Sequence, residues 1–97
     1  MNIIFQSINY KADTKLKNFA KKKINKINLF YKRITNVFIS TKIENSSNKL
    51  NKYAEIKIGI PGNNIVVKKR SSSFEKAIKI AAVSAQRIIK KKKEKIR

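Results

Sequence analysis

Apolar and polar residues alternate along two central stretches of the chain, residues 34–44 and 52–60. A period of two places one set of side chains on a buried face and the other in water, so both stretches predict half-buried β-strands. Residues 2–8, rich in β-branched and aromatic side chains, and residues 65–70 predict two more strands. The sequence PGNN at residues 61–64 predicts a tight turn between the last two. The side chains predicted to face inward from the two central strands are Val37, Ile39, Thr41, Ile43, Ala54, Ile56, Ile58 and Ile60.

Two other stretches repeat apolar residues every three or four positions, which predicts amphipathic helices. The first is residues 14–31, for which Asp13 is a suitable N-cap. The second is residues 72–97, where Ser72 and Glu75 fit a capping box, a reciprocal pair of hydrogen bonds at a helix start. The predicted apolar stripes consist of Leu16, Phe19, Ala20, Ile24, Ile27 and Tyr31, and of Phe74, Ala77, Ile78, Ala81, Ala82, Ala85, Ile88 and Ile89.

The predicted element order is β-α-β-β-β-α in a chain of 97 residues, a length that suits a single domain. A sheet with one apolar face needs cover on that face, and two amphipathic helices supply it. We therefore expect an α+β fold in which two roughly parallel helices pack on one face of a four-stranded sheet. The outer surfaces of the helices then merge into one lysine-bearing surface. The polar residues 45–51 predict a loop between the second and third strands.

The chain carries 25 Lys and Arg against 5 Asp and Glu, a formal net charge of +20. A field of this strength attracts polyanions such as nucleic acids. Codon bias is a second explanation, because Lys, Asn and Ile have A/T-rich codons and make up about half of the chain. Such a bias accounts for part of the size of the charge, but for little of its placement on the two predicted helices.

The composition argues against most catalytic chemistry. Because the chain has no Cys and no His, it has no disulfide, no thiolate or imidazole metal site and no Ser-His or Cys-His nucleophile pair. Its two glycines form no phosphate-binding loop, and its few acids are not paired, so we expect no enzyme, cofactor or small-molecule substrate. The N-terminus does not resemble a signal peptide, and no stretch is long enough to span a membrane, so we expect a cytoplasmic protein.

Several motifs occur together in the order and spacing of a known family. The first predicted helix contains K-x-x-K at residues 23–26, followed by the sequence FYKRI at residues 30–34 and a strand over residues 37–44. The closing helix contains A-I at residues 77–78 and the basic run RIIKKKKEK at residues 87–95. With these motifs the chain resembles the ribosome hibernation-promoting factor family, also called ribosome-associated inhibitor proteins, over nearly its whole length. The resemblance implies a fold like that of double-stranded-RNA-binding domains.

The resemblance also implies a function. Members of the family bind the small ribosomal subunit between head and body, where tRNA and mRNA lie, and both helices contact 16S rRNA. This implies a hibernation factor that blocks translation and keeps ribosomes inactive in stationary phase or stress. The implied partners are the small subunit, whole ribosomes and, as for short family members without a dimerising second domain, a separate ribosome modulation factor. Family basic positions match Lys23, Lys26, Arg87, Lys91 and Lys93, and helix geometry adds Lys22 and Lys90 as RNA-binding residues.

Some features leave alternatives open. Lys79 stands where many members of the family have Asp, and Glu75 where some have Tyr, so the closing helix is more basic than is typical. One alternative is a general basic RNA- or DNA-binding protein without ribosome specificity. Another is adhesion of residues 90–95 to anionic lipids, which is weakened because the apolar stripe of the helix is needed by the sheet. On the open sheet face, Phe38 and Tyr53 are placed either to stack on bases or to pack across strands.

Overall fold

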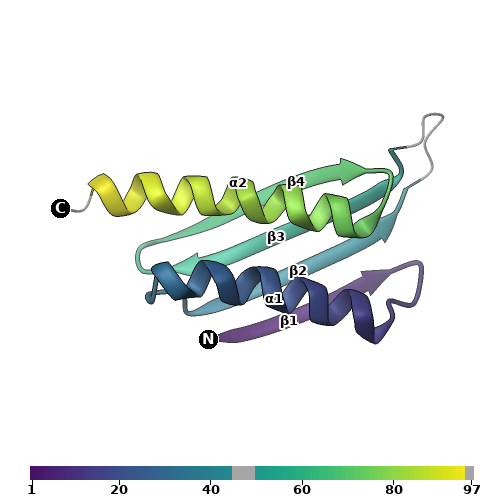
Figure 1. Cartoon of the computed structure of the whole chain (residues 1–97), viewed down its shortest axis with the longest axis horizontal. Helices are drawn as coiled ribbons and strands as arrows, with labels where there is room; N and C mark the ends of the chain where they lie inside the picture. Colours follow the sequence, from purple (N-terminus) through teal and green to yellow (C-terminus); the bar gives the residue numbers. More distant parts are fainter. Residues whose placement is uncertain (45–49, 96–97) are drawn as a thin grey trace.

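The structure is a computed structural model that describes the backbone of residues 1–44 and 50–95, and the side chains of these residues as far as residue 92. The elements are β1 (Asn2–Ile8), α1 (Thr14–Phe30), β2 (Asn36–Ile43), β3 (Lys52–Ile60), β4 (Asn63–Ser71) and α2 (Phe74–Lys95). This is the order that the sequence predicts, and the α+β fold is confirmed (Figure 1). Most of the predicted loop at residues 45–51 lies outside the described residues.

The strands form one four-stranded sheet in the order β1-β2-β3-β4. Strands β1 and β2 are parallel, since α1 carries the chain back between them, and the β2–β3 and β3–β4 pairs are antiparallel. Both helices lie on the same face of the sheet and run in the same direction (Figure 1). Their C-terminal halves therefore lie at the same end of the molecule, near the β3–β4 turn (Figure 1). Neither helix covers the opposite face of the sheet.

The β3–β4 turn is shorter than the sequence predicts. Residues Ile60 and Asn63 are paired, so only Pro61 and Gly62 lie outside the strands. Proline fixes a negative φ at the first turn position, and Gly62 adopts a φ of 80° at the second, which a residue with a side chain adopts with difficulty. Because two residues complete the turn, the rest of the predicted PGNN turn belongs to β4.

The core lies between the helices and the sheet, and the predicted alternation of β2 and β3 is largely confirmed. Val37, Ile39 and Thr41 are buried, but Ile43 is exposed because β2 ends there, beyond the cover of the helices. Each buried isoleucine contributes about 1.5–3 kcal/mol by leaving water. The helices contribute Leu16, Ala20, Ile24 and Ile27 from α1, and Ala77, Ile78, Ala81, Ala82, Ala85 and Ile89 from α2.

The start of α1 agrees with the sequence prediction, and the start of α2 differs from it. As predicted, the Asp13 side chain caps α1 by accepting a hydrogen bond from the Leu16 N–H at 2.8 Å. In α2 the Ser73 hydroxyl accepts from the Lys76 N–H at 3.2 Å, so the predicted capping box at Ser72 is wrong by one residue. The shift occurs because β4 continues through residue 71 and α2 begins only at Phe74. Helix α1 also ends one residue early, at residue 30.

Candidate nucleic-acid interface

The predicted RNA-binding residues of α1 lie one helical turn apart or less. Lys22 and Lys26 are exposed, because the helix buries its other face through Ala20 and Ile24. Lys23 is half-buried, and its Nζ lies 5.3 Å from the centroid of the Phe19 ring. Such a cation–π contact restrains the side chain without neutralising its charge. Of these three predicted residues, two are therefore exposed cations and one is a restrained cation.

The predicted residues of α2 form a second group. Arg87, Lys90 and Lys91 are exposed, and their spacing of three and four places them on one side of the helix. This side is distinct from the stripe that Ala85 and Ile89 bury in the core. Residue Lys93 belongs to α2, but its side chain lies outside the described residues, so its predicted role stays a prediction.

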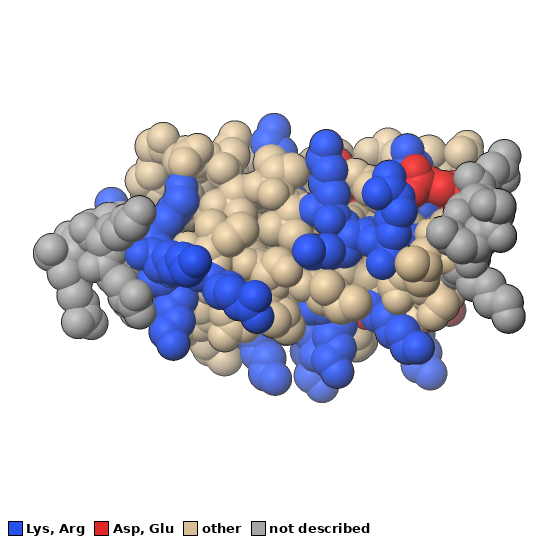
Figure 2. All heavy atoms as spheres, turned by 90° about the horizontal axis from the view of Figure 1, so that it is seen from above, with Lys and Arg blue, Asp and Glu red and all other residues tan. Residues whose placement is uncertain are grey.

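Helices α1 and α2 pack against each other and run in the same direction, so both groups lie from the middle of each helix towards its C-terminal end, at the same end of the helical layer. We name this the basic end; its described residues are Lys22, Lys23, Lys26, Arg87, Lys90 and Lys91. Figure 2, seen from above α2 and β4, shows Lys and Arg side chains along the length of the molecule. Asp and Glu side chains show in that view mainly near the end opposite the C-terminus.

The described acidic side chains lie away from the basic end. Asp13 and Glu75 stand at the N-terminal ends of the two helices, and Glu44 and Glu55 belong to the sheet region. In the described part of the chain, both ion pairs involve Glu44, with Arg70 Nε at 2.6 Å and Lys42 Nζ at 3.8 Å. Among the described side chains, no acid therefore offsets the positive charge of the basic end.

An apolar strip on α2, which the helical periodicity does not predict, adjoins the basic end. Ile80 is 45% exposed and Val83 is 48% exposed, although both are large and apolar. They line a shallow hollow of about 420 Å³ together with Lys76, Lys79, Ser84 and Arg87. The available signal was the spacing of three between the two residues, outside the predicted stripe. Ile88, which the sequence assigned to that stripe, is also exposed because it lies at the edge of the buried face.

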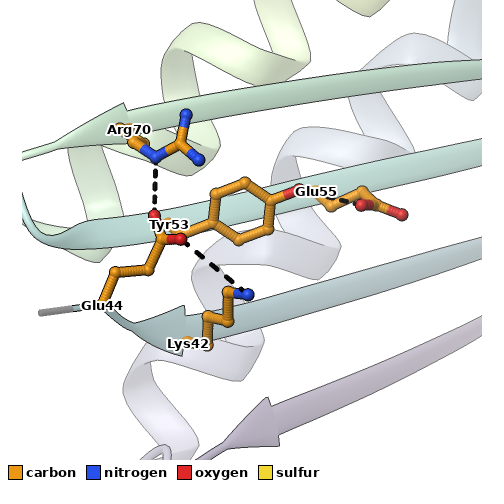
Figure 3. Close-up of polar contacts among 5 residues, drawn as sticks. All are labelled: Lys42, Glu44, Tyr53, Glu55 and Arg70. Carbon is orange, nitrogen blue, oxygen red and sulfur yellow. Dashed lines mark hydrogen bonds and ion pairs between the residues drawn. The ribbon is translucent and has the colours of Figure 1, made fainter.

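The open face of the sheet carries a compact polar cluster around Tyr53 (Figure 3). Lys42 Nζ and Arg70 Cζ lie over the Tyr53 ring, 5.1 Å and 5.2 Å from its centroid. The Tyr53 hydroxyl donates to Glu55 Oε2 at 2.9 Å, and Arg70 Nε donates to Glu44 Oε1. Burial and the hydrogen bond to Glu55 raise the pKa of Tyr53 to about 12. The hydrogen bond from Arg70 lowers the pKa of Glu44.

This cluster bears on the two roles left open for Tyr53. Its ring is already engaged by two cations, and its hydroxyl is bound to a neighbouring carboxylate. These contacts join β2, β3 and β4, so they favour cross-strand packing over base stacking at this position.

The described residues contain no group of three or more side chains of the metal-ligating types. None of the helices in the described part of the chain has the length and apolar character needed to cross a membrane.

The comparisons with known proteins agree on one family. A family model described as sigma 54 modulation protein / S30EA ribosomal protein matches residues 3–97. The chain belongs to this family. The resemblance to the ribosome hibernation-promoting factors is thereby confirmed. No curated protein sequence matches the chain significantly.

Two solved structures share the fold of this family member. A ribosomal subunit interface protein from Coxiella burnetii is similar with a TM-score of 0.85 and 22% identity, over 97% of this chain and 99% of that chain. The N-terminal domain of Protein Y from Thermus thermophilus is similar with a TM-score of 0.74 and 17% identity, over 94% of this chain and 98% of that chain. The family places the chain among ribosome-associated proteins.

Proposed function

We propose that this protein binds the small ribosomal subunit through the basic end, contacts 16S rRNA in the channel for tRNA and mRNA, and so blocks translation and stabilises inactive ribosomes in the cytoplasm. The observation that supports this proposal is a pair of adjoining helices whose exposed cations have no acidic partner within the described structure, in a chain of a ribosome-associated family. The solved structure titled a ribosomal subunit interface protein is consistent with such a location.

The physical basis is neutralisation of phosphates by side chains held on rigid helices. Each phosphate contact from Lys or Arg releases condensed counterions and adds affinity that does not depend on sequence. Structured RNA is recognised mainly by shape and by backbone contacts, which suits cations at fixed helical spacings. Arg87, Lys90 and Lys91 lie before the last turn of α2, so the helix fixes the positions of their backbones. No catalytic step is needed, because occupation of the channel excludes its normal ligands.

The proposal is tested by sedimentation of the protein with purified small subunits. The variant Arg87→Glu with Lys91→Glu should abolish co-sedimentation, because it replaces two attractive contacts with repulsive ones. A matched control is Lys11→Glu with Lys68→Glu, which changes the net charge equally at exposed positions away from the basic end. The control should bind like the wild type within a few-fold. Binding that survives in the first variant, or is lost equally in both, would contradict an interface at the basic end.

Competition experiments test where on the small subunit the protein binds. They also test the alternative that it binds nucleic acids in general. If the protein occupies the channel, saturating initiator tRNA should displace it, and the protein should displace tRNA in return. Tight binding that is indifferent to tRNA would place the protein elsewhere on the subunit. Excess duplex DNA or bulk RNA should leave the complex with the subunit intact. Removal by these competitors would instead indicate a general nucleic-acid-binding protein.

A further inference from the structure

The open face of the sheet contains a hollow of about 380 Å³ that is separate from the basic end. Its lining residues are Asn36, Phe38, Lys57, Gly59 and Asn64. The strand register explains how it forms: Asn36, Gly59 and Asn64 are partners across β2, β3 and β4, and Phe38 and Lys57 are partners on the same face. Because Gly59 has no side chain, the two asparagines flank a gap that a larger residue would fill.

The Asn36 amide is held in position beside this gap. The Thr35 hydroxyl donates to Asn36 Oδ1 at 3.1 Å and also lies 3.2 Å from the Gly59 carbonyl oxygen. A Cβ atom at position 59 would lie 2.1 Å from Asn36 Oδ1, so this placement of the amide requires glycine there. A polar group held by a neighbour loses less entropy when it binds a ligand than a free side chain does. The wall of the hollow is therefore partly preorganised.

We propose that this hollow binds one unpaired nucleotide of an RNA strand. Phe38 is 38% exposed and offers an aromatic surface on which a base can stack. The amides of Asn36 and Asn64 supply the donors and acceptors that read base edges, as asparagine does for adenine. Lys57 stands beside Phe38 in the sheet and is exposed, so it is placed to meet the phosphate of the same nucleotide.

The side chains that line the hollow favour a nucleotide over other ligands. A purely apolar partner would bury the two asparagine amides and the lysine without hydrogen bonds, which is unfavourable. A simple anion would use the lysine and the amide N–H donors, but neither the ring nor the amide oxygens. The ring of Phe38 also differs from that of Tyr53, because no cation lies over it among the described contacts. RNA as the ligand of this hollow rests on the proposed function, and the hollow would add a second contact on the opposite face of the molecule.

The test uses the whole chain and a short fluorescent oligoadenylate RNA as the probe, followed by anisotropy. Phe38→Ala should weaken binding by roughly 5- to 150-fold, the range for loss of one base–aromatic stack. Gly59→Ala should weaken it as well, since the new methyl group displaces the Asn36 amide and fills the gap. The fold should survive this change, because the atoms displaced are the ends of the Asn36 and Thr35 side chains.

Val66→Ala is the matched control, since Val66 is 47% exposed on the same face but does not line the hollow. It should bind the oligonucleotide like the wild type, and circular dichroism should show all three variants folded. If Phe38→Ala and Gly59→Ala bind as tightly as Val66→Ala, the inference is overturned. Displacement of the probe by polyglutamate as readily as by unlabelled RNA would also overturn it, since that result needs only charge.

The two proposals fail in different ways. A variant with Arg87→Glu and Lys91→Glu should no longer bind small subunits. Adding Phe38→Ala to this variant should still weaken oligonucleotide binding, because the hollow lies on the other face of the sheet. If wild-type protein does not bind subunits but its oligonucleotide binding depends on Phe38, the proposed function fails and the nucleotide site stands. If the wild-type protein binds subunits but Phe38→Ala leaves its oligonucleotide binding unchanged, the proposed function stands and the nucleotide site fails.

Discussion

Tyr53 is held in its protonated form by its neighbours on the open sheet face. A phenolate there would be poorly hydrated and would lie beside the Glu55 carboxylate, which is why the pKa rises to about 12. The folded pKa exceeds the ordinary value of about 10, so the stabilisation is complete below about pH 10 and is lost as the pH rises towards 12. We expect absorbance titration to show a late-ionising tyrosine that is missing in Tyr53→Phe. An unchanged titration in that variant would contradict the assignment.

The start of α2 shows how one residue sets the boundary of an element. Three serines precede the helix, and among the described contacts Ser73 is the one that accepts a hydrogen bond from a free N–H of the first turn, that of Lys76. Ser73→Ala should therefore lower the free energy of unfolding by about 1 kcal/mol. Ser72→Ala, one position earlier and exposed, should change it by less than about 0.5 kcal/mol. Denaturant unfolding measures both, and equal losses would show that the cap is shared.

The elements themselves were predictable because periodicity depends only on local sequence. Strand β3 has the predicted bounds, and its apolar residues face the core as expected. The choice of Ser73 as the cap of α2 was not predictable. It depends on where β4 ends and on the stacking of Phe74 against Tyr10, whose ring centroids lie 4.4 Å apart. Tertiary contacts of this kind leave no local pattern.

Some residues of the candidate sites could be predicted from local sequence, and others could not. The cations of the basic end were named from helical spacing and family motifs, and the described ones are found on adjoining helices. The sheet hollow was not predictable, because it depends on the pairing of β3 with two neighbours and on a side chain that Gly59 lacks. The strip formed by Ile80 and Val83 was missed because two apolar residues outside a strong stripe carry too little periodicity to be noticed.

The whole molecule carries a formal charge of +20, so a general attraction to RNA must be separated from binding by one surface. If six to ten phosphates are contacted, affinity for small subunits should fall roughly 10³–10⁵-fold between about 50 and 200 mM salt. Neutralising two real contacts, in Arg87→Gln with Lys91→Gln, should reduce the slope of log affinity against log salt by about 2. Lys11→Gln with Lys68→Gln removes the same charge elsewhere and should leave the slope nearly unchanged. Equal changes in both variants would mean that total charge, rather than the basic end, controls binding.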